Sequence, residues 1–304
     1  MRIGYFSGAA GAQQSIEAIA EDVERAEVEG FASYSLANIF SHDAVAALGI
    51  AGLRTKRIEL LTAVVPSYPR HPSALAQQAL TTQAMCRGRF TLGIGVSHKI
   101  VIEDMLGMSF EKPARHMREY LSVLVPLLTE KSVRFRGEQY AVSLDLDVPD
   151  AAAVPCLVAA MGPVMLKLTG ALADGTSLWM TGPKTVETRI APPLRASAAE
   201  AGRAEPRLVA GVPVLLSDDV DAGRSLAAKQ FEVYGTLPSY RGMLDHEGHA
   251  GPGDTALIGS EKEIEAGMRA YADAGATDLN VVTFGSVAQQ VRTRACVADL
   301  TPEL

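Results

Sequence analysis

The sequence lacks the features that mark several classes of protein. No apolar run approaches the roughly 18 residues that a membrane-spanning helix needs, and no basic region followed by a long apolar one opens the chain. The formal net charge of −7 disfavours nucleic acid as a partner. We therefore expect a cytoplasmic protein that binds neither membranes nor nucleic acid.

Cysteine is scarce, because the 304 residues include only Cys86, Cys156 and Cys296. Their number is odd, and their spacing differs from that of metal-binding motifs. We expect reduced, mostly buried thiols and no metal site. The Gly-x-Ser-x-Gly elbow of serine hydrolases is also missing, which disfavours a protein nucleophile.

Short apolar runs alternate with helical patterns along nearly the whole chain, which is typical of a parallel sheet wrapped by helices. Eight such rounds predict an α/β protein with a (β/α)8 TIM barrel, formed by a single domain over residues 1–304. The predicted strands begin at Arg2, Ala32, Ile58, Phe90, Pro155, Thr176, Arg207 and Thr277. The predicted helices cover residues 15–29, 43–54, 72–86, 113–130, 163–173, 185–202, 219–234, 261–274 and 286–299. An open doubly wound sheet is disfavoured, because residues 4–11 lack the Gly-x-Gly-x-x-Gly spacing.

Two insertions interrupt this alternation, one after the fourth strand and one after the seventh. The first runs from Ser97 to Lys112, and a predicted hairpin through residues 133–142 follows it. The second runs from Gly235 to Thr255. Binding loops gather at the carboxyl ends of barrel strands, so the second insertion either closes over a site or is a plain loop.

Two Gly-Pro pairs stand at expected helix starts after neighbouring strands. Met161, Gly162 and Pro163 follow the fifth strand, and Thr181 and Lys184 flank the second pair after the sixth strand. A glycine at a helix start lets backbone N–H groups approach an anion, and the helix dipole favours negative charge there. Each pair alone is also an ordinary helix start. Because they occur on neighbouring strands, the two pairs predict a phosphate site.

Several motifs together resemble a known family. The most specific are Gly-Arg-Phe-x-Leu-Gly-x-Gly at 88–95 and Ala-Asp-Gly at 173–175, supported by Thr-Ala-Val-Val-Pro at 62–66 and Ala-Ala-Met-Gly-Pro at 159–163. In this order they resemble the bacterial luciferase-like monooxygenase superfamily, specifically its branch of oxidoreductases that use the deazaflavin coenzyme F420. The resemblance spans almost the whole chain.

The resemblance implies a luciferase-like barrel with the cofactor ring at the carboxyl end of the strands and its phosphate held after strands five and six. It also implies a non-proline cis peptide on the third strand, at Thr62–Ala63 or its neighbour. The implied cofactor-binding residues are Asn38, Thr62, Ala63, Val64, Ser97, Met161, Gly162, Pro163, Thr181 and Lys184. FMN is the alternative cofactor. A homodimer is implied as well, with an interface predicted at Ala74, Leu75, Ala79 and Leu80.

Chemistry is expected from the cofactor rather than from a protein nucleophile. C5 of the reduced deazaflavin would pass a hydride to a C=C, C=N or C=O bond of a small organic substrate, or the oxidised form would accept one from an alcohol. His98, which follows the fourth strand, and His42 are candidate proton donors. For His42 the alternative is an exposed position beside a helix cap at Asp43.

Aromatic and methionine side chains are predicted to line an apolar substrate pocket, with core packing as the alternative. The candidates are Tyr68, Trp179, Tyr240 and Met243. Two other functions remain open: an FMN-dependent monooxygenase that uses oxygen, and a catalytically silent homologue that only binds the cofactor.

Overall fold

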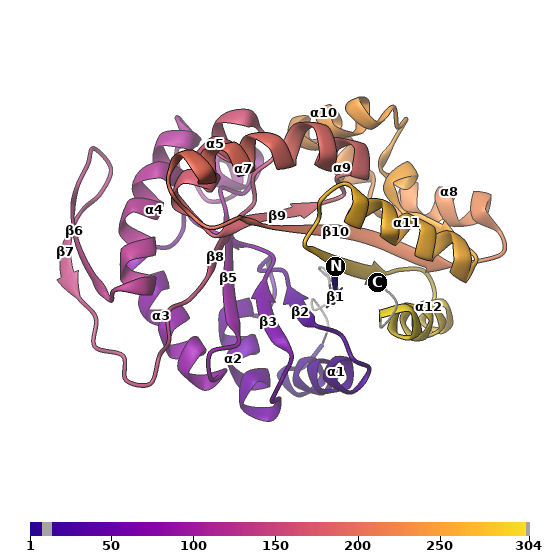
Figure 1. Cartoon of the computed structure of the whole chain (residues 1–304), viewed down its shortest axis with the longest axis horizontal. Coiled ribbons are helices and arrows are strands. Elements are labelled where there is room, and N and C mark those ends of the chain that lie inside the picture. Colours follow the sequence, from indigo (N-terminus) through magenta and orange to yellow (C-terminus); the bar gives the residue numbers. More distant parts are fainter. Residues whose placement is uncertain (8–13, 302–304) are drawn as a thin grey trace.

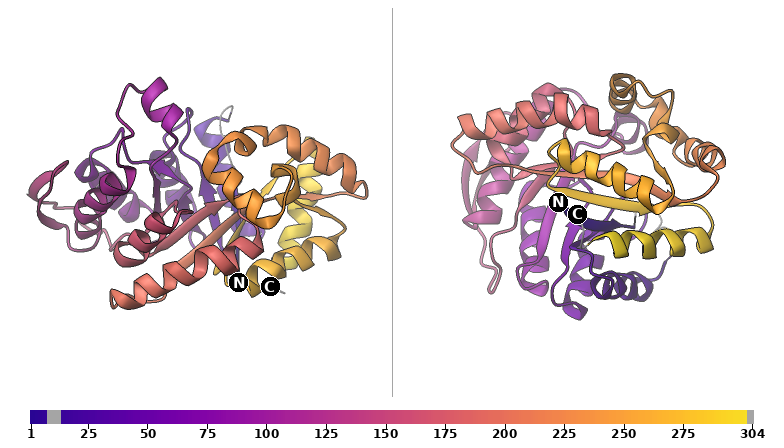
Figure 2. Two further views of the ribbon diagram at one scale, coloured as in Figure 1. Left: turned by 90° about the horizontal axis from the view of Figure 1, so that it is seen from above. Right: turned by 45° about the vertical axis from the view of Figure 1, so that its right-hand side comes forward.

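The apolar runs form strands that close into a parallel barrel surrounded by helices (Figure 1, Figure 2). A computed structural model describes residues 1–7 and 14–301. The barrel strands are β1 (Arg2–Phe6), β2 (Ser33–Leu36), β3 (Glu59–Thr62), β5 (Phe90–Gly95), β8 (Cys156–Val158), β9 (Gly175–Trp179), β10 (Arg207–Leu216) and β12 (Asp278–Thr283). The ring closes because β10 pairs with both β9 and β12. The predicted barrel is confirmed, and each strand begins within one residue of its predicted start; residues 8–11 of the glycine-rich stretch lie outside the described chain.

Helices cover the outside of the strands, and the core lies between the two layers. They are α1 (Ile16–Val28), α2 (Ala44–Arg54), α3 (Pro72–Met85), α4 (Pro113–Thr129), α5 (Pro163–Leu172), α8 (Val220–Gln230), α9 (Glu232–Thr236), α11 (Glu261–Asp273) and α12 (Val287–Leu300). Between β9 and β10 the chain is helical without a break from residue 183 to 200, as α6 (Pro183–Thr185), η3 (Val186–Ile190) and α7 (Ala191–Glu200). Local side chains cap several helix N-termini: Ser15, Asp43, Asp219, Ser260 and Ser286.

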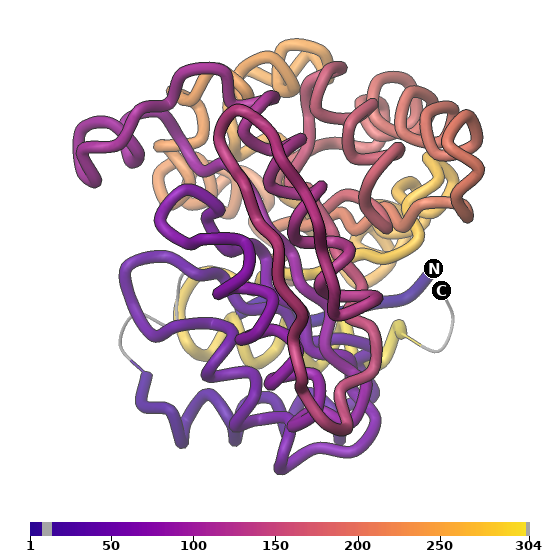
Figure 3. Tube along the Cα trace, turned by 90° about the vertical axis from the view of Figure 1, so that its left-hand side faces the viewer, coloured from indigo at the N-terminus to yellow at the C-terminus, as the bar shows by residue number. Residues whose placement is uncertain are grey.

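The first insertion contains a π-helical turn, η2 (Ile100–Met105), before α4. After α4 the chain forms the predicted hairpin from β6 (Ser132–Arg136) and β7 (Ala141–Asp145), which pair antiparallel. In Figure 3 the hairpin belongs to the long extended loop that faces the viewer, and it lies over the outer side of α4.

The second insertion is folded rather than irregular. It contains α10 (Pro238–Glu247) and a 3₁₀ turn, η4 (Pro252–Thr255), and it leads into β11 (Leu257–Gly259), which pairs with the end of β10. These three elements were not predicted, because the segment has many turn residues and little apolar periodicity. A short strand β4 (Val65–Pro66) likewise extends the third round and pairs with β5.

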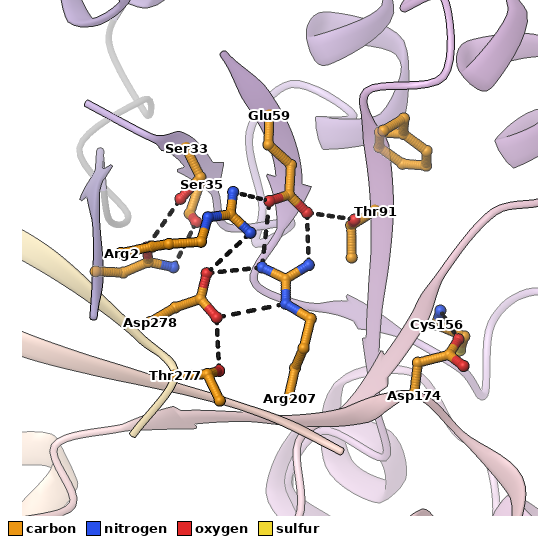
Figure 4. Close-up of polar contacts among 12 residues, drawn as sticks. Arg2, Ser33, Ser35, Glu59, Thr91, Cys156, Asp174, Arg207, Thr277 and Asp278 are labelled. Carbon is orange, nitrogen blue, oxygen red and sulfur yellow. Dashed lines mark hydrogen bonds and ion pairs between the residues drawn. The ribbon is translucent and has the colours of Figure 1, made fainter. Parts of the chain in front are cut away.

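The amino end of the barrel is closed by charged side chains that pair with one another, among which Asp278 is buried and Arg2 is exposed (Figure 4). Arg207 donates to Glu59 at 2.7 Å and to Asp278 at 2.8 Å, and Arg2 pairs with the same two carboxylates. Burial alone would raise the pKa of Glu59. The hydrogen bonds and charge of Arg207 and the charge of Arg2 lower this pKa by more than burial raises it, so the net shift is downward. Each of these residues stands at the first position of its strand, so the cluster ties four strands together.

Polar side chains also fill the barrel interior between β1, β2 and β12. Asn280 accepts a hydrogen bond from Ser33 at 3.2 Å and donates one to Ser35 at 2.7 Å. A Cβ atom on Gly4 would lie 2.1 Å from the Asn280 side chain, so glycine at this position makes room for the network.

The predicted dimer interface on α3 is wrong. Leu75, Ala79 and Leu80 are buried in the core of this chain, and Ala74 alone of the four is exposed. Leu75, Ala79 and Leu80 lie on the face of α3 that packs against the barrel. Their apolar character is therefore explained without an interface to a second copy of the chain. The homodimer itself stays a prediction.

The three cysteines are free and buried, as predicted. Among the helices within residues 1–7 and 14–301, none has both the length and the apolar character needed to cross a bilayer.

Candidate functional site

The third strand ends in an irregular backbone segment at the carboxyl end of the barrel. The peptide bond Ala63–Val64 is cis, which confirms the prediction of a cis bond at Thr62–Ala63 or its neighbour. The Thr62 hydroxyl donates to the Gly93 carbonyl at 2.9 Å and accepts from the Gly93 amide at 2.8 Å. A Cβ atom on Gly93 would lie 2.0 Å from the Thr62 carbonyl oxygen, so glycine lets the two strands come this close.

His98 follows β5 at the same end of the barrel. Ser97 has φ +61, a left-handed conformation that turns the chain after the strand. The His98 carbonyl accepts from the amides of Val101 and Ile102, which starts η2. Burial lowers the pKa of His98, so its imidazole is neutral at neutral pH. Within the described residues no hydrogen-bond partner of this imidazole is found, which leaves both ring nitrogens available to a ligand.

Aromatic rings form a continuous series from β1 to His98. Phe6 contacts Trp179 at 5.5 Å between ring centroids, and Trp179 contacts Tyr234 at 5.9 Å. Tyr234 contacts Tyr240 at 4.9 Å, and Tyr240 lies 6.0 Å from His98. The structure thus brings Trp179, Tyr240 and His98, all predicted site residues, into one cluster. Tyr234 also belongs to this cluster but is not among the predicted site residues. Its position at the end of the predicted helix 219–234, just before the second insertion, is the feature of the sequence that points to it.

Tyr68 belongs to a second aromatic cluster. Its ring stacks on His116 with centroids 3.9 Å apart and contacts Phe110 at 5.5 Å. The Tyr68 hydroxyl is buried and has no partner in the described part of the chain. His116 forms a 2.9 Å hydrogen bond with Ser67, and burial lowers its pKa to about 4, so this imidazole is neutral. No local pattern predicts that His116 meets Ser67 and Tyr68, since 49 residues separate Ser67 from His116.

Met243, the fourth residue predicted to line the substrate pocket, lies on α10. Its side chain is half-buried and packs against the main core. Core packing, the alternative to a pocket-lining role, therefore explains the buried part of the Met243 side chain.

Asn38 and His42 follow β2 and take part in local structure. The Asn38 side-chain oxygen accepts from the Ala44 amide at 2.9 Å and from Arg70 at 3.4 Å. His42 is exposed and its Nε2 lies 3.0 Å from the carbonyl oxygen of Gln14, while Asp43 caps α2. His42 therefore has the exposed position beside the helix cap at Asp43 that the sequence offered as the alternative to a catalytic role.

The first Gly-Pro pair leaves an open helix N-terminus. Gly162 is the N-cap of α5 and provides no side chain to bond the free backbone N–H groups. Apart from Gly162 itself and its two chain neighbours, no atom of the described residues lies within 4 Å of the position that a Cβ on Gly162 would take. The Thr181 hydroxyl contacts the Met161 sulfur at 3.8 Å, so the two predicted phosphate loops touch each other.

The second Gly-Pro pair has a neighbour from a distant part of the chain. Gly182 is the N-cap before α6, and the Glu247 carboxylate accepts from the Thr185 amide at 2.5 Å. Lys184 is exposed beside this contact. Glu247, the last residue of α10, was not predicted, because nothing in its local sequence indicates a partner 62 residues away.

A metal centre finds no support here: within residues 1–7 and 14–301, no three His, Cys, Asp or Glu side chains gather as metal ligands would. In the described part of the chain, this end of the barrel offers the open N-terminus of α5, the neutral imidazole of His98 without a hydrogen-bond partner, and aromatic rings. Such a set can bind an anionic group and an apolar molecule close to a group that exchanges protons.

Comparison with known proteins points to one family. The sequence profile of the family described as luciferase-like monooxygenase matches residues 1–278. A putative coenzyme F420-dependent oxidoreductase of Mycobacterium tuberculosis is 32% identical over 189 residues, which cover 58% of this chain and 54% of that protein. The matched segments span 54% to 66% of the length of such curated relatives.

Solved structures share the fold at low identity. The coenzyme F420-dependent tetrahydromethanopterin reductase from Methanopyrus kandleri has a TM-score of 0.80 and 21% identity, with 100% of this chain and 98% of that chain covered. A type II Baeyer-Villiger monooxygenase of Pseudomonas putida in complex with FMN has a TM-score of 0.78 and 16% identity, with 100% and 99% covered. At these identities the likeness shows the fold alone.

Proposed function

The chain belongs to the luciferase-like monooxygenase family, and from this premise we propose that it is an oxidoreductase that uses coenzyme F420 to transfer a hydride to or from a small organic substrate. The relative named as F420-dependent supports this choice of cofactor. The observation that carries the proposal is the open helix N-terminus at Gly162, which lies at the same end of the barrel as the irregular segment after β3.

A phosphate-bearing cofactor fits these residues. The space beside Gly162 is open, and the first turn of α5 presents backbone N–H groups without a side-chain cap. Met161, Pro163 and Thr181 would surround the phosphate, and the exposed ammonium group of Lys184 would neutralise part of its charge.

The ring system would lie against Thr62, Ala63 and Val64. A Cβ on Gly95 would lie 2.9 Å from the Val64 side chain, so glycine lets Val64 take its place in this segment. Ser97 and Asn38 would bond its polar edge. Because the Asn38 oxygen already accepts two hydrogen bonds, its NH₂ group is the part left to donate to a ligand. When bound, the deazaflavin supplies the hydride chemistry at C5.

The chain itself would bind, orient and exchange a proton. Trp179 and Tyr240 would hold an apolar substrate next to His98, with Tyr68 and Met243 further out in the pocket wall. His98 would move a proton between the solvent and the substrate through a ring nitrogen, and its lowered pKa lets it release that proton readily at neutral pH. His42, exposed and bonded at Gln14, is left out of this proposal.

An FMN-dependent monooxygenase is the second candidate, because a protein of the same fold is known in complex with FMN. The two cofactors differ in reactivity: a deazaflavin reacts poorly with oxygen, whereas reduced FMN reacts with it. A catalytically silent protein that only binds the cofactor is the third candidate.

Equilibrium binding of oxidised and reduced F420, FMN and NADPH to the purified protein tests the proposal. We expect F420 to bind more tightly than the others, followed by hydride exchange without oxygen, measured by absorbance at the deazaflavin band. Turnover that needs FMN and oxygen would favour the monooxygenase. Tight F420 binding without exchange to any acceptor would favour the silent protein.

A further inference from the structure

The helix that follows β9 begins at a carboxylate supplied by another part of the chain. The Thr185 amide, in the first turn, donates to Glu247 at 2.5 Å. A Cβ on Gly182 would lie 2.5 Å from the carboxyl carbon of Glu247, so glycine is what lets the carboxylate come this close. The preceding residue, His246, bonds the Thr188 hydroxyl at 2.8 Å. The end of α10 is therefore fastened to the first two turns of this helix.

This capping differs from that of the other barrel helices. Helices α1, α2, α8, α11 and α12 are capped by the residue just before them. The helix over residues 183–200 receives its carboxylate from 62 residues away. The hydroxyl of Thr185 is buried and has no hydrogen-bond partner in the described part of the chain. This first turn therefore holds a second polar group, besides the Thr185 amide, that could bond a ligand.

The same α10 places an aromatic ring on His98. Tyr240 lies in its first turn and contacts both His98 and Tyr234. Beyond α10, the chain is fastened to α8 by the Arg224–Asp254 ion pair, and Asp254 accepts from the amides of Ala250 and Gly251. Glu247 thus fixes the end of α10 that faces the predicted phosphate loop.

We propose that Glu247 is a built-in competitor for the anionic tail of the cofactor: its carboxylate and a phosphate use the same backbone N–H group, and binding of one displaces the other. This inference rests on the proposed function, which puts the phosphate at the first turn of α5 with Thr181 and Lys184 of the second Gly-Pro loop beside it, and it adds the Thr185 amide to the groups that the phosphate would contact. Two negative groups cannot share one N–H donor at bonding distance, and the charge of Lys184 can pair with only one of them at full strength. Displacement of Glu247 leaves the His246–Thr188 contact to hold the end of α10, so tail binding loosens this end and also changes how Tyr240 covers His98.

The experiment titrates the full chain with inorganic phosphate and follows the fluorescence of Trp179. This is the single tryptophan of the sequence, and it contacts Tyr234 next to α10. Glu247→Gln keeps an oxygen that accepts the Thr185 amide but removes the charge. We expect it to bind phosphate at least tenfold more tightly than the natural chain. The control is Asp245→Asn, which removes a charge from the same helix at a residue bonded to Arg241; it should bind within twofold of the natural chain.

Equal or weaker phosphate binding by Glu247→Gln would overturn the competition and leave Glu247 as a helix cap. So would the absence of phosphate binding in all three proteins. A melting curve of each variant shows that the comparison is made on folded protein. The same titrations with F420 and FMN separate the two proposals. If Glu247→Gln gains affinity for phosphate while no chain binds either cofactor, the proposed function fails and the competition stands.

Discussion

At the amino end of the barrel, charged side chains are paired with one another, whereas at the carboxyl end several polar groups have no partner within the described chain. Arg207 lies between Glu59 and Asp278, and both carboxylates also meet Arg2. At the other end, the imidazole of His98 is unpaired and the N-terminus of α5 is open at Gly162.

The difference separates stability from binding. Paired buried charges hold strand ends in register, and removing one partner leaves the other charge uncompensated. Unpaired polar groups do little for the free chain and are available to a ligand. Sites in this type of barrel gather at the carboxyl ends of the strands, which agrees with the second group as the binding end.

The largest effect is expected from Arg207→Ala at the amino end. The change leaves the carboxylates of Glu59 and Asp278 with the partly exposed Arg2 as their remaining cationic partner. We therefore expect a loss in the free energy of unfolding that approaches the roughly 3 to 5 kcal/mol of a broken buried pair. Urea unfolding measures it, and cofactor affinity of the folded protein should be unchanged. Arg134→Ala, which breaks an exposed ion pair with Asp145 on the hairpin, is the control and should leave the urea midpoint in place. A midpoint shift of similar size in both variants would contradict the contrast between the two ends.

His98→Gln at the carboxyl end should lower activity and leave stability unchanged, the reverse of the effect expected for Arg207→Ala. If His98 exchanges the proton, kcat falls about 100-fold or more. The melting temperature and the cofactor Kd should stay near those of the natural chain, because no hydrogen bond of the imidazole within the described residues is lost. An unchanged kcat with an altered melting temperature would make His98 a structural residue.

The strands and helices follow largely from local patterns in the sequence, whereas the pairing of the charges does not. Apolar runs and helix signals such as Ser260 and Ser286 are set by neighbouring residues, so strand starts and helix limits were predicted closely. The charges at Arg2, Glu59, Arg207 and Asp278 occupy first strand positions, yet their pairing depends on closure of the barrel. No local pattern indicates which strand ends meet.

The place of some candidate site residues could be predicted, for the same reason, while their roles stay predictions. Residues at or just after strand ends, such as Trp179 and His98, could be placed at the carboxyl end from the order of the elements. Helix α10 could not, because it has little apolar periodicity and is held by contacts such as that of Glu247 with Thr185. The cis peptide came from the family resemblance, since no property of Ala63 or Val64 indicates it.

Lys184→Ala should have a smaller effect, confined to binding. The exposed ammonium group contributes a charge to the predicted phosphate site, so its removal should weaken binding of phosphate-bearing cofactors by about 1 to 3 kcal/mol. Isothermal titration with F420 measures the loss, and urea unfolding should show the stability of the natural chain. Lys229→Ala, on the last turn of α8, removes an equal charge and serves as the control. Unchanged affinity would remove Lys184 from the site.

The smallest effect is expected from mild acid acting on Glu59 at the amino end. The pKa of Glu59 is lowered in the folded chain, because the hydrogen bonds and charges of Arg207 and Arg2 outweigh burial. In the unfolded chain this carboxyl has its ordinary pKa of about 4.3. Between the two values the unfolded state binds more protons, so the contribution of Glu59 to stability is complete above about pH 5 and is lost as the pH falls through the folded pKa.

Urea unfolding at pH 7, 5, 4 and 3 should therefore show a decline in the free energy of unfolding that begins below pH 5 and is shallower in Glu59→Gln. Glu265→Gln, which breaks a pair with Arg269 on the surface of α11, should keep the natural slope. If Glu59→Gln also kept the full slope, other groups would govern acid unfolding, and the buried cluster would owe its strength to packing rather than to charge.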